Sequence, residues 1–89
     1  MRLAPSPNVV SSRLGDGAVL VHLETNQIFE LNTTGVRAWE LISEGLDLDA
    51  VIDQLGREFD VEAGRVRAEV TDLVAALVQQ GLLDDRRGG

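Results

Sequence analysis

The sequence contains no cysteine and a single histidine, His22, and these two shortages exclude whole classes of site. Without cysteine, the chain can form neither a disulfide framework nor a thiolate metal site. One histidine cannot supply a histidine-rich metal site. Aromatic residues are also scarce, since Phe29, Trp39 and Phe59 are the only ones. The core must therefore be built mainly from leucine, valine, isoleucine and alanine.

Basic residues are the next shortage, because eight of them face fifteen acidic residues and the formal net charge is −7. Nucleic-acid binding depends largely on counterions released when a basic surface meets phosphates, so nucleic acid is not an expected partner. Anionic membrane surfaces are disfavoured for the same reason. The apolar runs are too short to cross a bilayer, and residues 1–7 lack the apolar centre of a signal peptide. We expect a cytoplasmic protein.

Motifs that carry chemistry are missing as well. Acid–base catalysis needs carboxylates in different environments, whereas Asp47, Asp49 and Asp53 fall at a helix start and on a polar helix face. The Asp47-x-Asp49 pair fails as a calcium loop, because apolar residues occupy the next required positions. His22 has no third group to orient it as a base. We expect no enzyme activity, no metal and no cofactor.

What is present is the pattern of one small α+β domain, since 89 residues do not suffice for a second core. Three short apolar segments separated by turn residues are expected to form an antiparallel sheet. The middle segment is apolar on both alternating faces, which is typical of a central strand, so the third should be an edge. The expected strands cover residues 9–13, 18–23 and 27–31.

Three helices should follow the strands. Asn32 and Asp47 are good N-cap residues, and Gly45 sits where a left-handed C-cap belongs. Strands followed by helices predict an α+β fold with winged-helix-like character. The helices are expected over residues 33–43, 48–59 and 63–80. We further expect an extended N-terminal arm over residues 1–8, a single domain over 9–83 and a flexible tail over 84–89.

The last helix carries two neighbouring apolar lines. One has the spacing of a core-facing stripe, and the other makes the apolar surface wider than one core contact requires. With an uncovered strand edge, such a surface can form a groove for a peptide that joins the sheet as an added strand. Alternatively, the second line covers the first two helices, and the pattern fits both interpretations. The first line is Val66, Val70, Leu73 and Leu77, and the second is Val74 and Val78 beside Arg67 and Thr71.

The terminal Gly88-Gly89 is shared with ubiquitin-like proteins and sulfur carriers, which are activated at that carboxylate. Their fold needs a strand after the helix to close a mixed sheet. Here the chain is predicted to end in its longest helix, which favours a tail without such a role.

Three segments, residues 29–45, 59–61 and 70–83, together resemble the PqqD-like proteins. These are the chaperones of pyrroloquinoline quinone biosynthesis and the wider class of recognition elements for ribosomally synthesised precursor peptides (RiPPs). The resemblance spans residues 9–83. It is carried by Leu-Asn before the first helix, Trp-x-Leu-Ile within that helix and the final Gly-Leu-Leu.

The resemblance implies a noncatalytic adaptor that binds the leader segment of a precursor peptide and presents it to a modifying or leader-removing enzyme. The leader would pair antiparallel to the third strand and rest against the third helix. The implied peptide-binding positions are Gln27, Ile28, Phe29, Glu30 and Leu31 on the strand, with Val66, Arg67, Val70, Thr71 and Val74 on the helix.

A free-standing chain of this length resembles most the stand-alone leader-binding proteins of lasso peptide biosynthesis, whose partner is a cysteine-protease-like leader peptidase. The first alternative is a peptide chaperone of pyrroloquinoline quinone biosynthesis that works with a radical enzyme. A winged-helix DNA-binding domain is a further alternative, which the net charge of −7 disfavours.

Overall fold

The computed structural model of the chain describes residues 3–85, and its central element is a three-stranded antiparallel sheet. The strand order is β2-β3-β4, so β3 is central and β4 is an edge, as the sequence pattern predicts. Every second residue of β3 is buried, and these residues line the inner face of the sheet. The strands are β2 (Val9–Leu14), β3 (Gly17–His22) and β4 (Ile28–Leu31).

The turn between β3 and β4 is built around Asn26 and His22. Asn26 adopts a positive φ of 60°, and its N–H donates to the carbonyl of His22 at 2.8 Å. The imidazole of His22 is buried, and its Nδ1 accepts from the backbone N–H groups of Glu24 and Thr25 at 3.2 and 3.4 Å. His22 therefore has a structural role in closing this turn.

Three helices follow, with caps at the predicted residues. The Asn32 side chain accepts from the N–H of Gly35 at 2.8 Å, and that of Asp47 accepts from Ala50 at 2.9 Å. Each bond satisfies a donor that a helix start leaves free, which is why both helices begin where the sequence indicates. The helices are α1 (Thr33–Ser43), α2 (Leu48–Glu58) and α3 (Ala63–Gln79).

A second, two-stranded sheet differs from the sequence expectation. β1 (Leu3–Pro5), within the expected N-terminal arm, pairs antiparallel with β5 (Leu83–Asp85), so the chain does not end in its longest helix. The side chains of Leu3 and Leu83 are both buried in the core. Because β5 joins β1 and not the three-stranded sheet, it does not close the mixed sheet of a ubiquitin-like carrier. The terminal Gly-Gly lies outside the described residues.

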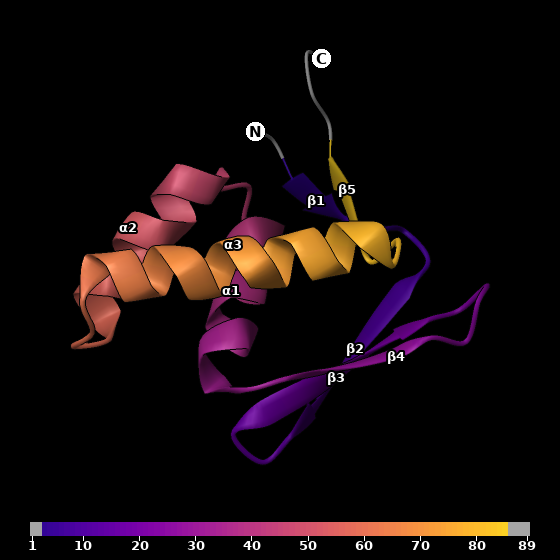
Figure 1. Ribbon diagram of the computed structural model, residues 1–89. Coiled ribbons are helices and arrows are strands. Elements are labelled where there is room, and N and C mark those ends of the chain that lie inside the picture. Colours follow the sequence, from indigo (N-terminus) through magenta and orange to yellow (C-terminus); the bar gives the residue numbers. More distant parts are fainter. Residues whose placement is uncertain (1–2, 86–89) are drawn as a thin grey trace.

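The helices and the small β1–β5 sheet lie on one side of the three-stranded sheet, and its other face carries no helix (Figure 1). The core lies between these layers and is almost entirely aliphatic, as the composition requires. Trp39 packs against it and is only half-buried. None of the helices within residues 3–85 has the length and hydropathy to cross a membrane. The fully buried side chains with the largest volumes are Leu20, Ile42, Leu55, Leu77, Leu82, Leu83, Val51 and Val70.

A bidentate ion pair joins α1 to α2. Arg37 donates from Nε and Nη2 to the two carboxylate oxygens of Glu58 at 2.8 and 3.0 Å, and Gln54 donates to the same carboxylate at 2.7 Å. The bonds from Arg37, followed by that from Gln54, lower the pKa of Glu58 below its ordinary value of 4.5. The protonation of Glu58 is therefore linked to the stability of the fold.

This linkage predicts an acid-dependent loss of stability that Glu58→Gln reduces. Since the pKa of Glu58 is lower in the folded chain, its contribution is complete above about pH 4.5 and is lost as the pH falls through the lower folded value. Urea unfolding at several pH values should show a smaller acid-induced decrease in the free energy of unfolding for Glu58→Gln. Glu62→Gln, at the exposed start of α3, should retain the wild-type profile; if both variants match the wild type, the linkage is absent.

Candidate functional site: the free edge of β4 and its groove

The candidate site begins with the backbone of β4, because one side of this strand has no neighbour in the sheet. The N–H of His22 donates to the carbonyl of Gln27 at 2.9 Å, so these two residues form a hydrogen-bonded cross-strand pair. Bonded and non-bonded pairs alternate along an antiparallel ladder. The N–H and C=O groups of Ile28 and Glu30 consequently point away from β3. They are available to another strand.

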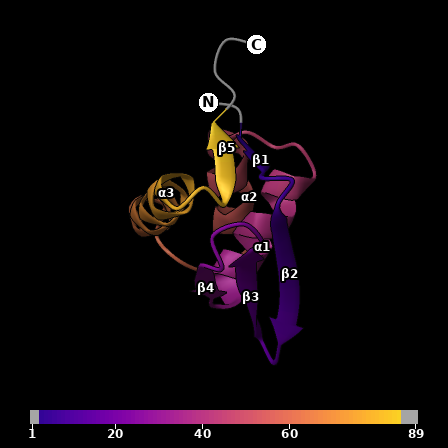
Figure 2. The same ribbon diagram turned by 90° about the vertical axis from the view of Figure 1, so that its right-hand side faces the viewer.

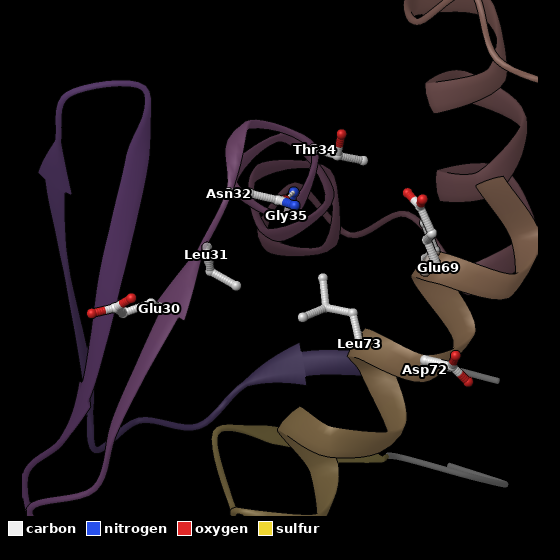
Figure 3. Close-up of a pocket in the computed structure, with 9 residues that line it drawn as sticks. Glu30, Leu31, Asn32, Thr34, Gly35, Glu69, Asp72 and Leu73 are labelled. Atoms are coloured by element: carbon white, nitrogen blue, oxygen red, sulfur yellow. Dashed lines mark hydrogen bonds between the residues drawn. The ribbon is translucent and has the colours of Figure 1, made fainter. Parts of the chain in front are cut away.

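A groove of about 570 Å³ lies between the end of β4, the start of α1 and the middle of α3. Figure 2 looks along α3 and shows β4 as the strand of the sheet on the α3 side. Leu31 and Leu73 project toward each other from the two walls, whereas the carboxylate of Glu30 points away from α3 (Figure 3). The lining residues are Glu30, Leu31, Asn32, Thr34, Gly35, Glu69, Val70, Asp72 and Leu73.

Two glycines allow close packing around the end of β4. A Cβ atom at Gly35 would lie 3.3 Å from both the Leu31 side chain and Asn32 Oδ1, so glycine permits α1 to start close to the end of β4. A Cβ atom at Gly17 would collide with the carbonyl oxygen of Leu31. Both positions fix the end of β4, which is the apolar end of the groove. Gly35 lies in the first turn of α1, so this turn packs closely against the end of β4.

The charged residues that line the groove are all acidic: Glu30 on the strand, whose carboxylate points away from α3 (Figure 3), and Glu69 and Asp72 on α3. Arg65 partly balances Glu69, with 3.3 Å between Nε and Oε1. The apolar floor consists of Leu31, Val70 and Leu73. Such a groove suits an extended peptide with apolar anchors and some positive charge. Pairing with the same edge of a second copy would bring carboxylates together, which disfavours self-association here.

The structure brings together only part of the predicted set. Ile28, Phe29, Glu30 and Leu31 form β4, and Gln27 precedes it. Of the five predicted helix positions, Val66, Val70 and Val74 all belong to the core, with exposures of 3%, 1% and 3%, and of these three only Val70 also lines the groove. Whether these positions contact a leader stays a prediction. The predicted peptide-binding set lacks three α3 residues that line the groove: Glu69, Asp72 and Leu73, the last of which the sequence pattern assigned to the core-facing line.

The remaining predicted positions lie on the other side of α3. Arg67 pairs with Asp49 of α2 at 3.4 Å, and both side chains are exposed. Thr71 and Val74 line a separate apolar cavity of about 340 Å³ with Leu48 and Val78. The second apolar line of α3 thus lies beside Leu48 of α2, which agrees, for α2 only, with the alternative that it covers the first two helices.

Metal chemistry finds no support in the described part of the chain. Within residues 3–85, no group of three or more histidine, aspartate or glutamate side chains is placed to hold a metal ion. The residues of the site offer backbone hydrogen bonds, apolar contacts and negative charge.

Comparison with known proteins identifies the family of this fold. The family model of coenzyme PQQ synthesis protein D (PqqD) matches residues 17–83, which include the three-stranded sheet from β3 onward and all three helices. The chain belongs to the PqqD family. Its resemblance to PqqD-like proteins, drawn from the sequence, is thereby confirmed. Among curated proteins, none matches the chain significantly.

Two solved structures share the PqqD-like fold along almost the whole chain. One, described as TbiB1 in complex with the TbiA(beta) leader peptide, is 32% identical with a TM-score of 0.84. It covers 93% of this chain, and the match covers 96% of that protein. The other, lasso peptide synthetase B1 complexed with the leader peptide, has the same TM-score, 20% identity and coverages of 96% and 100%. At 20% identity the second supports the fold alone.

Proposed function

We propose that this PqqD-family chain is a noncatalytic adaptor that binds the leader segment of a ribosomally synthesised precursor peptide by strand addition to β4. The observation that carries the proposal is the free backbone edge at Ile28 and Glu30 beside an apolar groove. An added strand gains affinity from main-chain hydrogen bonds. Its alternate side chains enter pockets that select for particular residues. The similar TbiB1 structure contains a leader peptide, which supports this assignment.

Strand direction then orients the leader. A leader antiparallel to β4 begins near Leu31, beside the apolar floor of the groove, and leaves near Ile28 at the β3–β4 turn. Its anchoring residues would lie against Leu31, Val70 and Leu73, and Glu69 and Asp72 would favour a basic residue on the adjoining stretch. The part of the precursor that an enzyme must reach follows the leader, so it emerges at the turn.

Within this role, lasso peptide biosynthesis is the setting that we favour, with a leader-removing enzyme as partner. The support is the sequence resemblance to the stand-alone leader-binding proteins of lasso peptide biosynthesis, together with the 32% identity over 93% of the chain to TbiB1, whose structure contains a leader peptide. The adaptor holds the precursor at a high effective concentration for the enzyme and contributes no reacting group. A cytoplasmic location agrees with a role on newly synthesised peptides.

The second candidate is a peptide chaperone of pyrroloquinoline quinone biosynthesis, which the name of the matching family model favours. The two candidates differ in the peptide that is bound. In a competition titration, we expect a lasso leader to displace a labelled precursor of the quinone pathway, and the reverse order of affinities would favour the chaperone.

Amide hydrogen exchange tests strand addition directly. A synthetic leader peptide, taken from the precursor encoded beside this chain, should slow exchange at Ile28 and Glu30 because their N–H groups become bonded. The ladder alternation also leaves the N–H groups of Ser11 and Arg13 unpaired on the opposite edge, at β2, and these serve as internal controls. Protection at β2 with none at β4, or no saturable binding at all, would contradict the proposed function.

A further inference from the structure

The outer face of the three-stranded sheet carries an apolar patch that the leader groove does not use. Val10, Val21 and Ile28 are direct cross-strand neighbours in one row on the face opposite the helices. Leu23 follows β3 at the same end of the sheet. The side chains of Val10, Leu23 and Ile28 are 48%, 58% and 65% exposed. We call these four residues the outer patch.

The position of the outer patch relates it to the bound leader. Ile28 belongs both to this patch and to the free edge of β4, so an added strand would extend the outer face next to it. Alternate side chains of the leader would then lie beside Ile28, while the others enter the groove. The patch also lies at the β3–β4 turn, where a leader antiparallel to β4 leaves the protein. Apolar surface is thus exposed next to the emerging precursor.

We propose that the outer patch is the docking surface for the enzyme that acts on the precursor, an inference that rests on the proposed leader binding. Exposed apolar residues grouped at one place commonly mark protein–protein contacts. An enzyme seated there would contact the adaptor and the leader strand together, with the segment to be processed directly in front of it. Docking is therefore expected to be stronger when the leader is bound.

Charge around the outer patch specifies the chemistry of the partner. The carboxylates of Glu24 and Glu30 are exposed beside it, and Asn8 holds that of Glu24 through a bond of 2.9 Å. The fitting partner surface is apolar at its centre and basic at its rim. A second copy of this chain fits poorly, since a two-fold contact would oppose these carboxylates, and each copy already carries a net charge of −7.

Single substitutions outside the leader site test this surface. Val10→Ser and Leu23→Ser remove patch contacts, whereas Leu14→Ser serves as the matched control, since Leu14 is 63% exposed at the other end of the sheet. With the full chain, its precursor and the purified leader-removing enzyme, both patch variants should weaken enzyme binding about tenfold and lower the processing rate at limiting adaptor concentration. Leader affinity, measured separately by fluorescence anisotropy without enzyme, should stay within about twofold of wild type.

Several outcomes would overturn the inference and leave the leader-binding function intact. These are unchanged enzyme affinity in both folded variants, an equal loss in Leu14→Ser, or a wild-type dimer that Leu23→Ser dissociates without any change in enzyme binding. Leu23 follows the strand, so Leu23→Ser keeps the test valid even if Val10→Ser disturbs β2. Absence of leader binding by the wild-type chain would instead refute the proposed function, and the docking inference with it.

Discussion

Glu30→Pro should weaken leader binding at least roughly 30-fold while the domain remains folded. Proline removes the outward N–H of β4 and places its ring where the incoming carbonyl would bond. The leader then keeps an unpaired carbonyl at a buried contact, at a cost of about 1–3 kcal/mol in addition to the lost bond. Proline is tolerated at sheet edges, so the β3–β4 ladder should survive. Isothermal titration with the leader peptide measures the loss, and circular dichroism monitors the fold.

Two control substitutions isolate the backbone as the cause. Glu30→Ala retains the N–H and removes the carboxylate, so it should bind far more tightly than the proline variant. Ser11→Pro places the same ring on the free edge of β2, where no leader is expected, and should bind as the wild type does. A folded Glu30→Pro variant with wild-type affinity would rule out strand addition at β4.

Local signals in the sequence predicted most of the fold because each depends on neighbouring residues. Asn32 and Asp47 cap their helices through bonds to residues only three positions away, so type and spacing suffice to locate both helix starts. Asn26 likewise indicates its own turn through its tolerance of a positive φ. The order of the strands was predicted from the middle segment, which is apolar on both faces and therefore typical of a central strand.

Features that depend on distant contacts were not predictable in this way. β1 and β5 are three-residue strands about eighty positions apart, and neither has the length or alternation that identifies a strand. The pairing of β1 with β5 is stabilised by the Leu3 and Leu83 side chains, which are both buried in the core. A short segment that contains Pro5 therefore reads as an extended arm, although it forms an edge pair in the folded chain.

The helix side of the candidate site could not be fixed from the sequence for a different reason. Periodicity determines which α3 residues share a face with the buried Val70, yet it does not say which flank of that face turns toward β4. Three of the positions implied by the resemblance, Arg67, Thr71 and Val74, lie on the flank that meets α2 in the structure. Leu73 on the opposite flank, with Glu69 and Asp72 nearby, faces β4. The path of the loops around the core decides between the flanks.

Substitutions on the two flanks of α3 should therefore differ in their effect on leader binding. Leu73→Ala removes apolar contact from the floor of the groove and should cost about 1–2 kcal/mol, which is roughly a 5- to 30-fold weaker dissociation constant. Val78→Ala truncates a comparably half-buried side chain on the α2 flank and should leave binding unchanged. Thermal unfolding of both variants shows whether their losses of stability match.

Substitutions of two polar residues extend the same comparison to positions that the sequence resemblance implies. Arg67→Glu and Thr71→Ala should bind the leader as the wild type does, because their side chains lie beside α2 and not beside β4. If they weaken binding while Leu73→Ala does not, the leader rests on the α2 flank of α3, and the cavity with Leu48 replaces the β4 groove as its anchor site. Reduced binding in the Leu73 variant alone would place the apolar anchors of the leader between Leu31 and α3.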